Sequence, residues 1–225
     1  APPGQTALLA TVDPCKGTKG LARLHSYLSL MFGAAGVIHG THACDSGDRG
    51  DLVAAVNNNI AQWADNLQPS DARLSDVTQA AGEPSWALPH GVSKGTPSKT
   101  PGALIQEMGA GLAVATFLPV GTDGEVNRTQ SAPMMLLLDT RTGEKHDAPQ
   151  NTSLVLDASI MGWTPMVGDA ETGFASCEKY VLGNAPTVEL LPGEALLIGL
   201  QQEAPSPPPG SANTKRKLWG RSGGT

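Results

Sequence analysis

Apolar residues recur at helical spacing in two stretches near the beginning of the chain. Both stretches step by three or four residues, and a polar break over residues 41–50 separates them. Residues spaced in this way form a stripe along one side of an α-helix. With Asp48 or Asp51 available as a cap and Pro69 beyond the end of the second stretch, the pattern predicts a helical hairpin. The stripes are Leu21, Leu24, Leu28, Met31, Ala35 and Ile38, then Val53, Val56, Ile60, Trp63 and Leu67.

The pattern changes to that of strands in the second half of the chain. Aliphatic runs alternate there with turn sequences such as Leu191-Pro-Gly-Glu194. We expect strands over residues 112–118, 134–139, 153–158, 187–191 and 195–200, another short strand within 5–12, and a short helix over 103–108. The predicted fold class is α+β, in which the N-terminal helical hairpin packs on a C-terminal antiparallel β-sheet or sandwich.

Composition divides the chain into four parts. Residues 1–67 are the helical part, and residues 68–102 form an extended Pro/Gly-rich wrapping segment. Residues 103–203 are β-rich, and residues 204–225 are a basic, Pro-rich arm that we expect to be disordered. Glycine and proline occupy 27 and 18 of the 225 positions, which predicts long loops. A single domain also fits this length.

Charge is distributed unevenly along the chain. The net charge is −6, but the arm carries four basic residues and no acidic ones, so residues 1–203 hold 11 basic and 21 acidic residues, a net charge of −10. Such an acidic body is a poor general binder of nucleic acid. The arm combines its charges with an aromatic side chain, which predicts a partner-binding site with weak nucleic-acid contact as a further use. The residues concerned are Lys215, Arg216, Lys217, Trp219 and Arg221.

One short segment gathers residues that bind metals. His39, His42, Cys44 and Asp45 lie close together in the sequence, and imidazole and thiolate are ligands that zinc prefers. Their spacing matches no standard zinc motif. We therefore expect a polar loop whose aspartates cap the next helix, and no resident metal or other cofactor.

Motifs for catalysis are weak. We expect no phosphate-binding loop, no dinucleotide fingerprint and no nucleophile elbow of the hydrolase type, and we assign no catalytic residue. The alternative is a small hydrolase or metal-dependent enzyme that uses the loop from His39 to Asp51. The prediction leans away from an enzyme.

Cysteine usage and hydropathy bear on the compartment. Three cysteines, Cys15, Cys44 and Cys177, are widely spaced and form no disulfide framework, which favours a reducing compartment. The longest nearly uncharged apolar run, residues 27–38, is shorter than the roughly 20 residues that cross a bilayer. We expect a soluble protein of the cytoplasm or of a virus particle, without a membrane partner.

A short phrase and the general composition carry a resemblance. The seven residues Ser70-Asp-Ala-Arg-Leu-Ser-Asp76 resemble a linker phrase that recurs in bacteriophage tail-fibre proteins. The abundance of small residues, the wrapping segments and the long arms look like those of surface or accessory proteins of virus particles. The resemblance implies a structural role and transfers no functional residue.

These observations favour an interaction protein. We predict a structural protein that self-associates and binds a larger assembly, a capsid accessory or surface protrusion on a capsid shell being the leading form. Besides the enzyme already named, a second alternative is a binding module that recognises an acidic partner through the basic arm.

Overall fold

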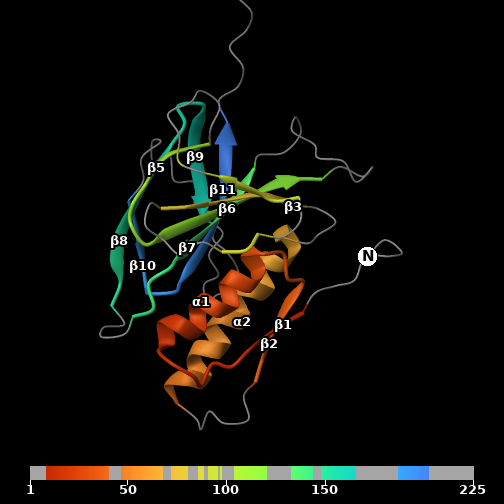
Figure 1. Cartoon of the computed structure of the whole chain (residues 1–225), viewed down its shortest axis with the longest axis vertical. Helices are drawn as coiled ribbons and strands as arrows, with labels where there is room; N and C mark the ends of the chain where they lie inside the picture. The colour runs from red at the N-terminus through yellow and green to blue at the C-terminus, as the bar shows by residue number, and fades with distance from the viewer. Residues whose placement is uncertain are drawn as a thin grey trace, which may run out of the picture.

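The computed structural model describes residues 9–40, 47–67, 72–80, 86–88, 91–95, 97, 104–120, 133–143, 148–165 and 187–202. Within them the chain forms two helices and eleven strands (Figure 1). The helices are α1 (Lys19–Met31) and α2 (Asp48–Leu67). The strands are β1 (Leu9–Val12), β2 (Gly36–His39), β3 (Ala72–Gln79), β4 (Ser93–Gly95), β5 (Ile105–Met108), β6 (Leu112–Pro119), β7 (Met134–Asp139), β8 (Gln150–Leu156), β9 (Ile160–Pro165), β10 (Thr187–Leu190) and β11 (Ala195–Gln202).

The strands form three sheets. The largest has six strands in the order β4-β3-β6-β7-β11-β9, all antiparallel to their neighbours except the parallel pair β3 and β4. A second sheet has the order β10-β8-β5 and is antiparallel. The third consists of β1 and β2, which pair in parallel.

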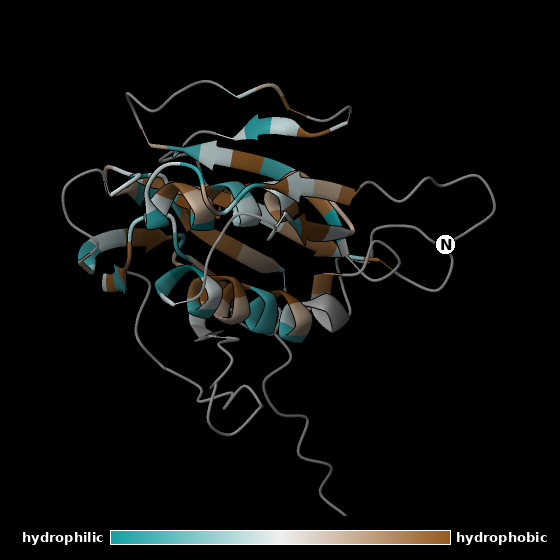
Figure 2. Cartoon of the chain, turned by 90° about the horizontal axis from the view of Figure 1, so that it is seen from below, coloured by the Kyte–Doolittle hydropathy of each residue, from teal (hydrophilic) through white to brown (hydrophobic). Residues whose placement is uncertain are grey.

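The central strands β6, β7 and β11 are buried on both faces. Side chains of one parity join the helices in one apolar cluster, and those of the other parity pack against the three-stranded sheet. A strand covered on both faces needs apolar residues at consecutive positions, which explains the unbroken aliphatic runs (Figure 2). Helix-facing residues are Ala113, Ala115, Phe117, Leu136, Leu138, Ala195 and Leu197, and those on the other face are Leu112, Val114, Met135, Leu137, Ile198 and Leu200.

The predicted helical hairpin on a β-sheet is wrong. Strands make up 46% of the described residues and helices 24%, so the described part is mainly β. The two helices are not consecutive elements, because β2 lies between them and pairs with β1. The first apolar stripe predicted a longer helix than the structure has. Ala35 and Ile38 lie beyond the end of α1, and Ile38 belongs to β2.

A glycine cap ends α1 early. Gly33 has φ of +85°, a backbone conformation that glycine adopts at little cost. Its N–H donates to the Leu30 carbonyl at 2.8 Å, and the Ala34 N–H donates to the Ser29 carbonyl at 3.0 Å. These two bonds form a Schellman motif, which turns the chain out of the helix. The β-branched pair Val37 and Ile38 then continues as β2.

Other expectations met mixed outcomes. Strands are present where they were expected over residues 112–118, 134–139 and 195–200. Residues 105–108, expected to be helical, form β5 instead. The resemblance phrase is no linker here, because its residues 72–76 lie within β3, which pairs with β6 inside the largest sheet. The basic arm lies outside the described residues.

The start of α1 is fixed to two neighbouring turns. Thr18 caps the helix, because its Oγ accepts a hydrogen bond from the Leu21 N–H at 3.0 Å. The same hydroxyl donates to the Thr142 carbonyl, just beyond β7. Nearby, Arg23 Nε donates to the Pro192 carbonyl at 2.8 Å in the turn between β10 and β11. These bonds set the position of α1 over the sheet.

Candidate functional site

Strands β1 and β2, with α1 between them in the sequence, form a β-α-β unit whose two strands lie at one side of the molecule (Figure 1). The parallel register pairs Leu9 with Gly36 and Thr11 with Ile38. Residues paired in this way share one face of the sheet. The opposite face carries the buried Val12 and the half-buried Val37, which packs against the helix-containing core.

The outer face of this small sheet is apolar and exposed. Leu9 is 56% exposed and Ile38 is 51% exposed, although both lie in strands, on the same face and diagonally across the pair. Met161 on β9, at 56%, is the other large apolar side chain with comparable exposure among the described residues. Parallel sheets are usually covered on both faces, and none of the described helices or strands covers this face.

One edge of β1 is open as well. The Gly40 N–H donates to the Val12 carbonyl at 2.9 Å, which shows that the backbone groups of Val12 point toward β2. Neighbouring residues of a strand point their backbone groups to opposite sides, so those of Leu9 and Thr11 point away from β2. No described strand pairs with β1 on that side. An open edge of this kind is a template for a further strand.

A cleft of about 400 Å³ lies beside β1 and along one side of α1. None of its lining residues comes from β2, which places it toward the open edge of β1. Its volume falls within the range typical of ligand sites. The helix contributes Leu21, His25, Leu28, Ser29 and Phe32, and β1 with the following loop contributes Thr11, Val12, Asp13 and Lys16.

Charge at the cleft is nearly balanced. The Lys16 Nζ lies 3.5 Å from the Asp13 Oδ2, and both side chains are largely or partly exposed. Such a surface pair contributes little to stability and leaves no strong local field. The apolar lining of Leu21, Leu28 and Phe32 therefore dominates what the cleft can recognise.

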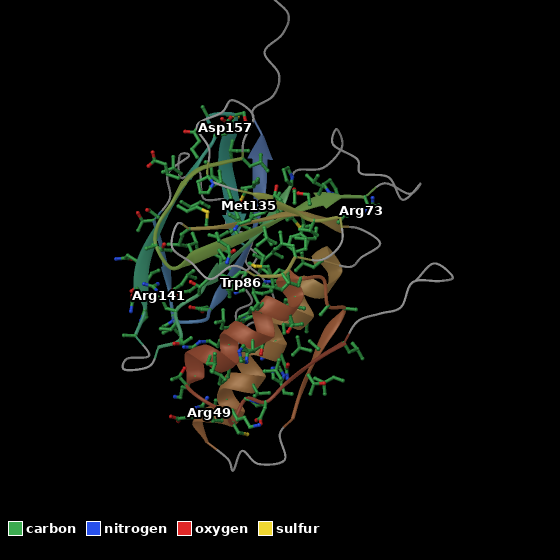
Figure 3. The ribbon with its side chains drawn as sticks, viewed as in Figure 1. Arg49, Arg73, Trp86, Met135, Arg141 and Asp157 are labelled. Carbon is green, nitrogen blue, oxygen red and sulfur yellow. The ribbon has the colours of Figure 1, made fainter. Side chains whose placement is uncertain are left out.

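The loop that follows β1 is braced from α2. Arg49 near the start of α2 donates to the Pro14 carbonyl at 3.1 Å and to the Gly17 carbonyl at 2.6 Å (Figure 3). Cys15 in the same loop is part of a disulfide, and the other two cysteines of the chain lie outside the described residues. A disulfide favours an oxidising environment over the reducing compartment expected from the sequence. The compartment itself stays a prediction.

His39, a predicted metal candidate, lies at the end of β2 and contacts α1. Its Nε2 lies 2.9 Å from the Oγ of Ser26, and that hydroxyl donates to the Ala22 carbonyl, also at 2.9 Å. Ser26 has one hydrogen to donate, so Nε2–H donates to Ser26 and not the reverse. Burial lowers the pKa of His39, and a hydrogen bond with Asn57 opposes this shift.

This arrangement does not activate a nucleophile. A catalytic serine donates its proton to the histidine, whereas here the histidine donates, and Ser26 is only 1% exposed. The remaining metal candidates, His42, Cys44 and Asp45, lie outside the described residues. Within the described ranges no three His, Cys, Asp or Glu side chains gather as metal ligands would.

The sequence does contain the Gly-x-Ser-x-Gly spacing, contrary to the expectation of no such elbow. It occurs at residues 91–95 and again at 220–224. In the first copy Ser93 is exposed on the edge strand β4 and donates to the Ser75 carbonyl at 3.2 Å. A nucleophile elbow needs a strand-to-helix turn, and Ser93 lies within a strand, so the spacing here is a coincidence. The second copy lies outside the described residues.

A buried ion pair links two sheets and has a structural role. Asp139 at the end of β7 is 1% exposed, and it accepts from the Arg141 backbone N–H and side-chain Nε at 2.8 Å each. Arg141, labelled in Figure 3, also donates to Gln150 at the start of β8. Since the carboxylate is occupied by these donors, we assign Asp139 to the joining of the two sheets.

The sequence reasoning missed the unit formed by β1, α1 and β2. Gly33 followed by two β-branched residues, Val37 and Ile38, was the available signal for an early helix end and a strand. The predicted partner-binding residues Lys215, Arg216, Lys217, Trp219 and Arg221 lie outside the described residues, so their role stays a prediction.

Comparisons with known proteins identify no relative. No protein-family model matches the sequence, and neither a characterised protein nor a solved structure matches it significantly. Among the described residues, neither helix is long and apolar enough to cross a membrane.

Proposed function

We propose that this chain is an interaction protein that self-associates and joins a larger assembly through β1 and β2. The observation that carries this proposal is the parallel pair itself, with Leu9 and Ile38 exposed on one face and no described strand paired with the outer edge of β1. Exposed apolar side chains that lie together on a sheet mark contact surfaces more often than single ones do. A capsid or another virus-particle shell is the assembly that the sequence resemblance favours.

Apolar side chains that are buried in the other sheets are half exposed in this one. Burying a Leu or Ile side chain completely contributes about 1.5–3 kcal/mol, and roughly half of that is still available at each of these two positions. Open backbone groups add directional bonds to this apolar contact. The two together favour association with another chain.

Sedimentation velocity across a range of concentrations tests the proposal. We expect the native chain to form a concentration-dependent species larger than the monomer, and the double variant Leu9→Ser, Ile38→Ser to shift this association to at least tenfold higher concentration. Met161→Ser is the matched control, because Met161 is equally exposed but lies on β9. A native chain that stays monomeric, or a control with the same effect as the double variant, contradicts the proposal.

A further inference from the structure

The cleft beside β1 has the form of a groove for an extended peptide. One wall is the open edge of a strand, and the other is a helix face that presents Leu21, Leu28 and Phe32. A strand that adds to such an edge forms backbone hydrogen bonds, and alternate side chains point toward the helix. A strand edge beside an apolar helix face therefore favours an extended segment over a compact small molecule.

The rim of the groove is held in place before anything binds. Arg49 bonds two carbonyls of the loop after β1, and Cys15 in that loop is disulfide-bonded. The helix wall is itself fixed by the cap at Thr18 and by the Arg23 bond to Pro192. A preformed site loses less conformational freedom on binding, which improves affinity for a given contact area.

We propose that this groove binds residues 204–225 of a second copy of the chain, which add as a strand to the open edge of β1 and place Leu218 or Trp219 against the helix wall. This inference rests on the proposed function and names the segment that carries out the self-association. The bound segment places its apolar side chains against the apolar lining of the groove and forms hydrogen bonds with the backbone groups of Leu9 and Thr11.

Charge favours this segment over the other parts of the chain. Residues 204–225 carry four basic side chains and no acidic one, whereas residues 1–203 have a net charge of −10. Because Asp13 and Lys16 balance each other at the groove, the attraction comes from the body as a whole. Attraction of this kind speeds encounter and weakens as salt is added.

The direction of the chain favours a second copy, and its length allows the segment to reach one. From Gln202 to the last residue there are 23 residues, that is 225 minus 202, which span up to about 75 Å when extended. Strand β11 ends at the top of the molecule in Figure 1, whereas β1 and α1 occupy the lower half. A segment leaving β11 therefore starts away from its own groove and is free to enter that of a neighbour.

The test uses the full chain with Trp219→Ala, because its own residues 204–225 then compete less well with an added peptide for the groove. The probe is a fluorescein-labelled synthetic peptide of residues 204–225. Fluorescence anisotropy should show saturable binding that 0.5 M sodium chloride weakens by about fivefold or more. Adding Thr11→Pro, which removes the N–H that faces the open edge, should weaken binding at least tenfold. Thr11→Ala keeps this N–H and should weaken binding far less than Thr11→Pro does.

Three outcomes would overturn the proposal. The first is an absence of peptide binding, and the second is equal binding to the Thr11→Pro and Thr11→Ala chains. Leu28→Asn, on the helix wall, covers the case in which the proline variant fails to fold, and unchanged binding to it counts equally against the groove. The third is a native chain that binds the peptide but sediments as a monomer, because the segment would then fold back on its own copy.

The same experiments separate this inference from the proposed function. If Leu9→Ser with Ile38→Ser abolishes association while the peptide does not bind, the small sheet is the interface and the groove is not. If the double variant associates like the native chain and the peptide does not bind, both proposals fail.

Discussion

The centre of the six-stranded sheet and the pair formed by β1 and β2 are both built from aliphatic strands, yet their surroundings are opposite. In β7, Leu136, Leu137 and Leu138 are at most 1% exposed, because helices cover one face and a second sheet covers the other. In the small sheet, Leu9 and Ile38 remain about half exposed. The same residue type therefore stabilises the fold in one place and is available to a partner in the other.

The two regions differ in side-chain exposure because they differ in the number of strands and layers that surround them. Each of β6, β7 and β11 has a strand on both sides and a layer on both faces. The pair β1 and β2 has one covered face, and β1 has one open edge among the described residues. Two strands alone are marginally stable, so the pair depends on α1 and on the braced loop beside it.

The largest expected effect separates the two regions directly. Leu137→Ala should lower the free energy of unfolding by about 2–5 kcal/mol, because it leaves a cavity between two sheets. Leu9→Ala should change it by no more than about 0.5 kcal/mol at concentrations where the chain is monomeric. Urea denaturation followed by circular dichroism measures both, and equal losses would erase the distinction between the regions.

The next largest effect on stability comes from the close approach of Gly193 to the backbone of Gly20 in α1. A side chain at Gly193, where φ is +72°, would overlap the Gly20 carbonyl, so Gly193→Ala should cost about 2–4 kcal/mol. Gly33 has a similar φ of +85° but open space around it, and Gly33→Ala should cost only about 1 kcal/mol. Thermal unfolding of both variants checks this order, and the reverse order would show that α1 is not held by that turn.

The disulfide at Cys15 tests how far the small sheet depends on its loop. Cys15→Ser should lower stability by about 2–4 kcal/mol under oxidising conditions, since the unfolded chain is then less constrained. Reductant should destabilise the native chain by a similar amount and should have no further effect on the variant. A variant as stable as the native chain would mean that Cys15 does not brace the unit.

The smallest effect concerns Asp76 on β3, which lies between the edge strand β4 and β6 in the large sheet. Burial raises the pKa of Asp76, and a hydrogen bond with Thr116 opposes the shift. The native state thus binds more protons than the unfolded chain, so Asp76 reduces stability as pH rises above about 3.9, the usual pKa of aspartate.

Asp76→Asn should accordingly stabilise the protein at pH 7 by less than about 1 kcal/mol, because solvent partly screens this carboxylate. The gain should vanish at low pH, where the carboxyl is protonated in both states. Thr78→Ser is a nearby control without a titrating group, and a gain for Asp76→Asn that persists at low pH would contradict the assignment.

Sequence periodicity predicted the strongly buried elements and failed where short signals compete. The runs in β6, β7 and β11 were long enough to identify as strands, and α2 was placed by its apolar stripe; Asp48 and Asp51, expected as alternative caps, both lie within its first turn. The first stripe, by contrast, continued across Gly33, because Ala35 and Ile38 keep helical spacing by coincidence. Here the local cap overrode the periodicity.

The candidate site was less predictable than the fold. A parallel pair joins residues 27 positions apart, as Leu9 and Gly36 show, and no local pattern reveals such a contact. The residues along β1 and β2 also lack the alternation of apolar and polar types that marks a half-buried strand. The groove beside it depends on how α1 lies against β1, which only the three-dimensional arrangement shows.

Hydrogen exchange of the native chain, measured below and above the concentration at which it associates, tests the central claim most directly. We predict that association slows exchange at the amides of Leu9 and Thr11, whereas the amides of β6 and β7 are protected equally in both samples. Association that protects another surface and leaves β1 unchanged would contradict the claim that this chain assembles through its uncovered pair of strands.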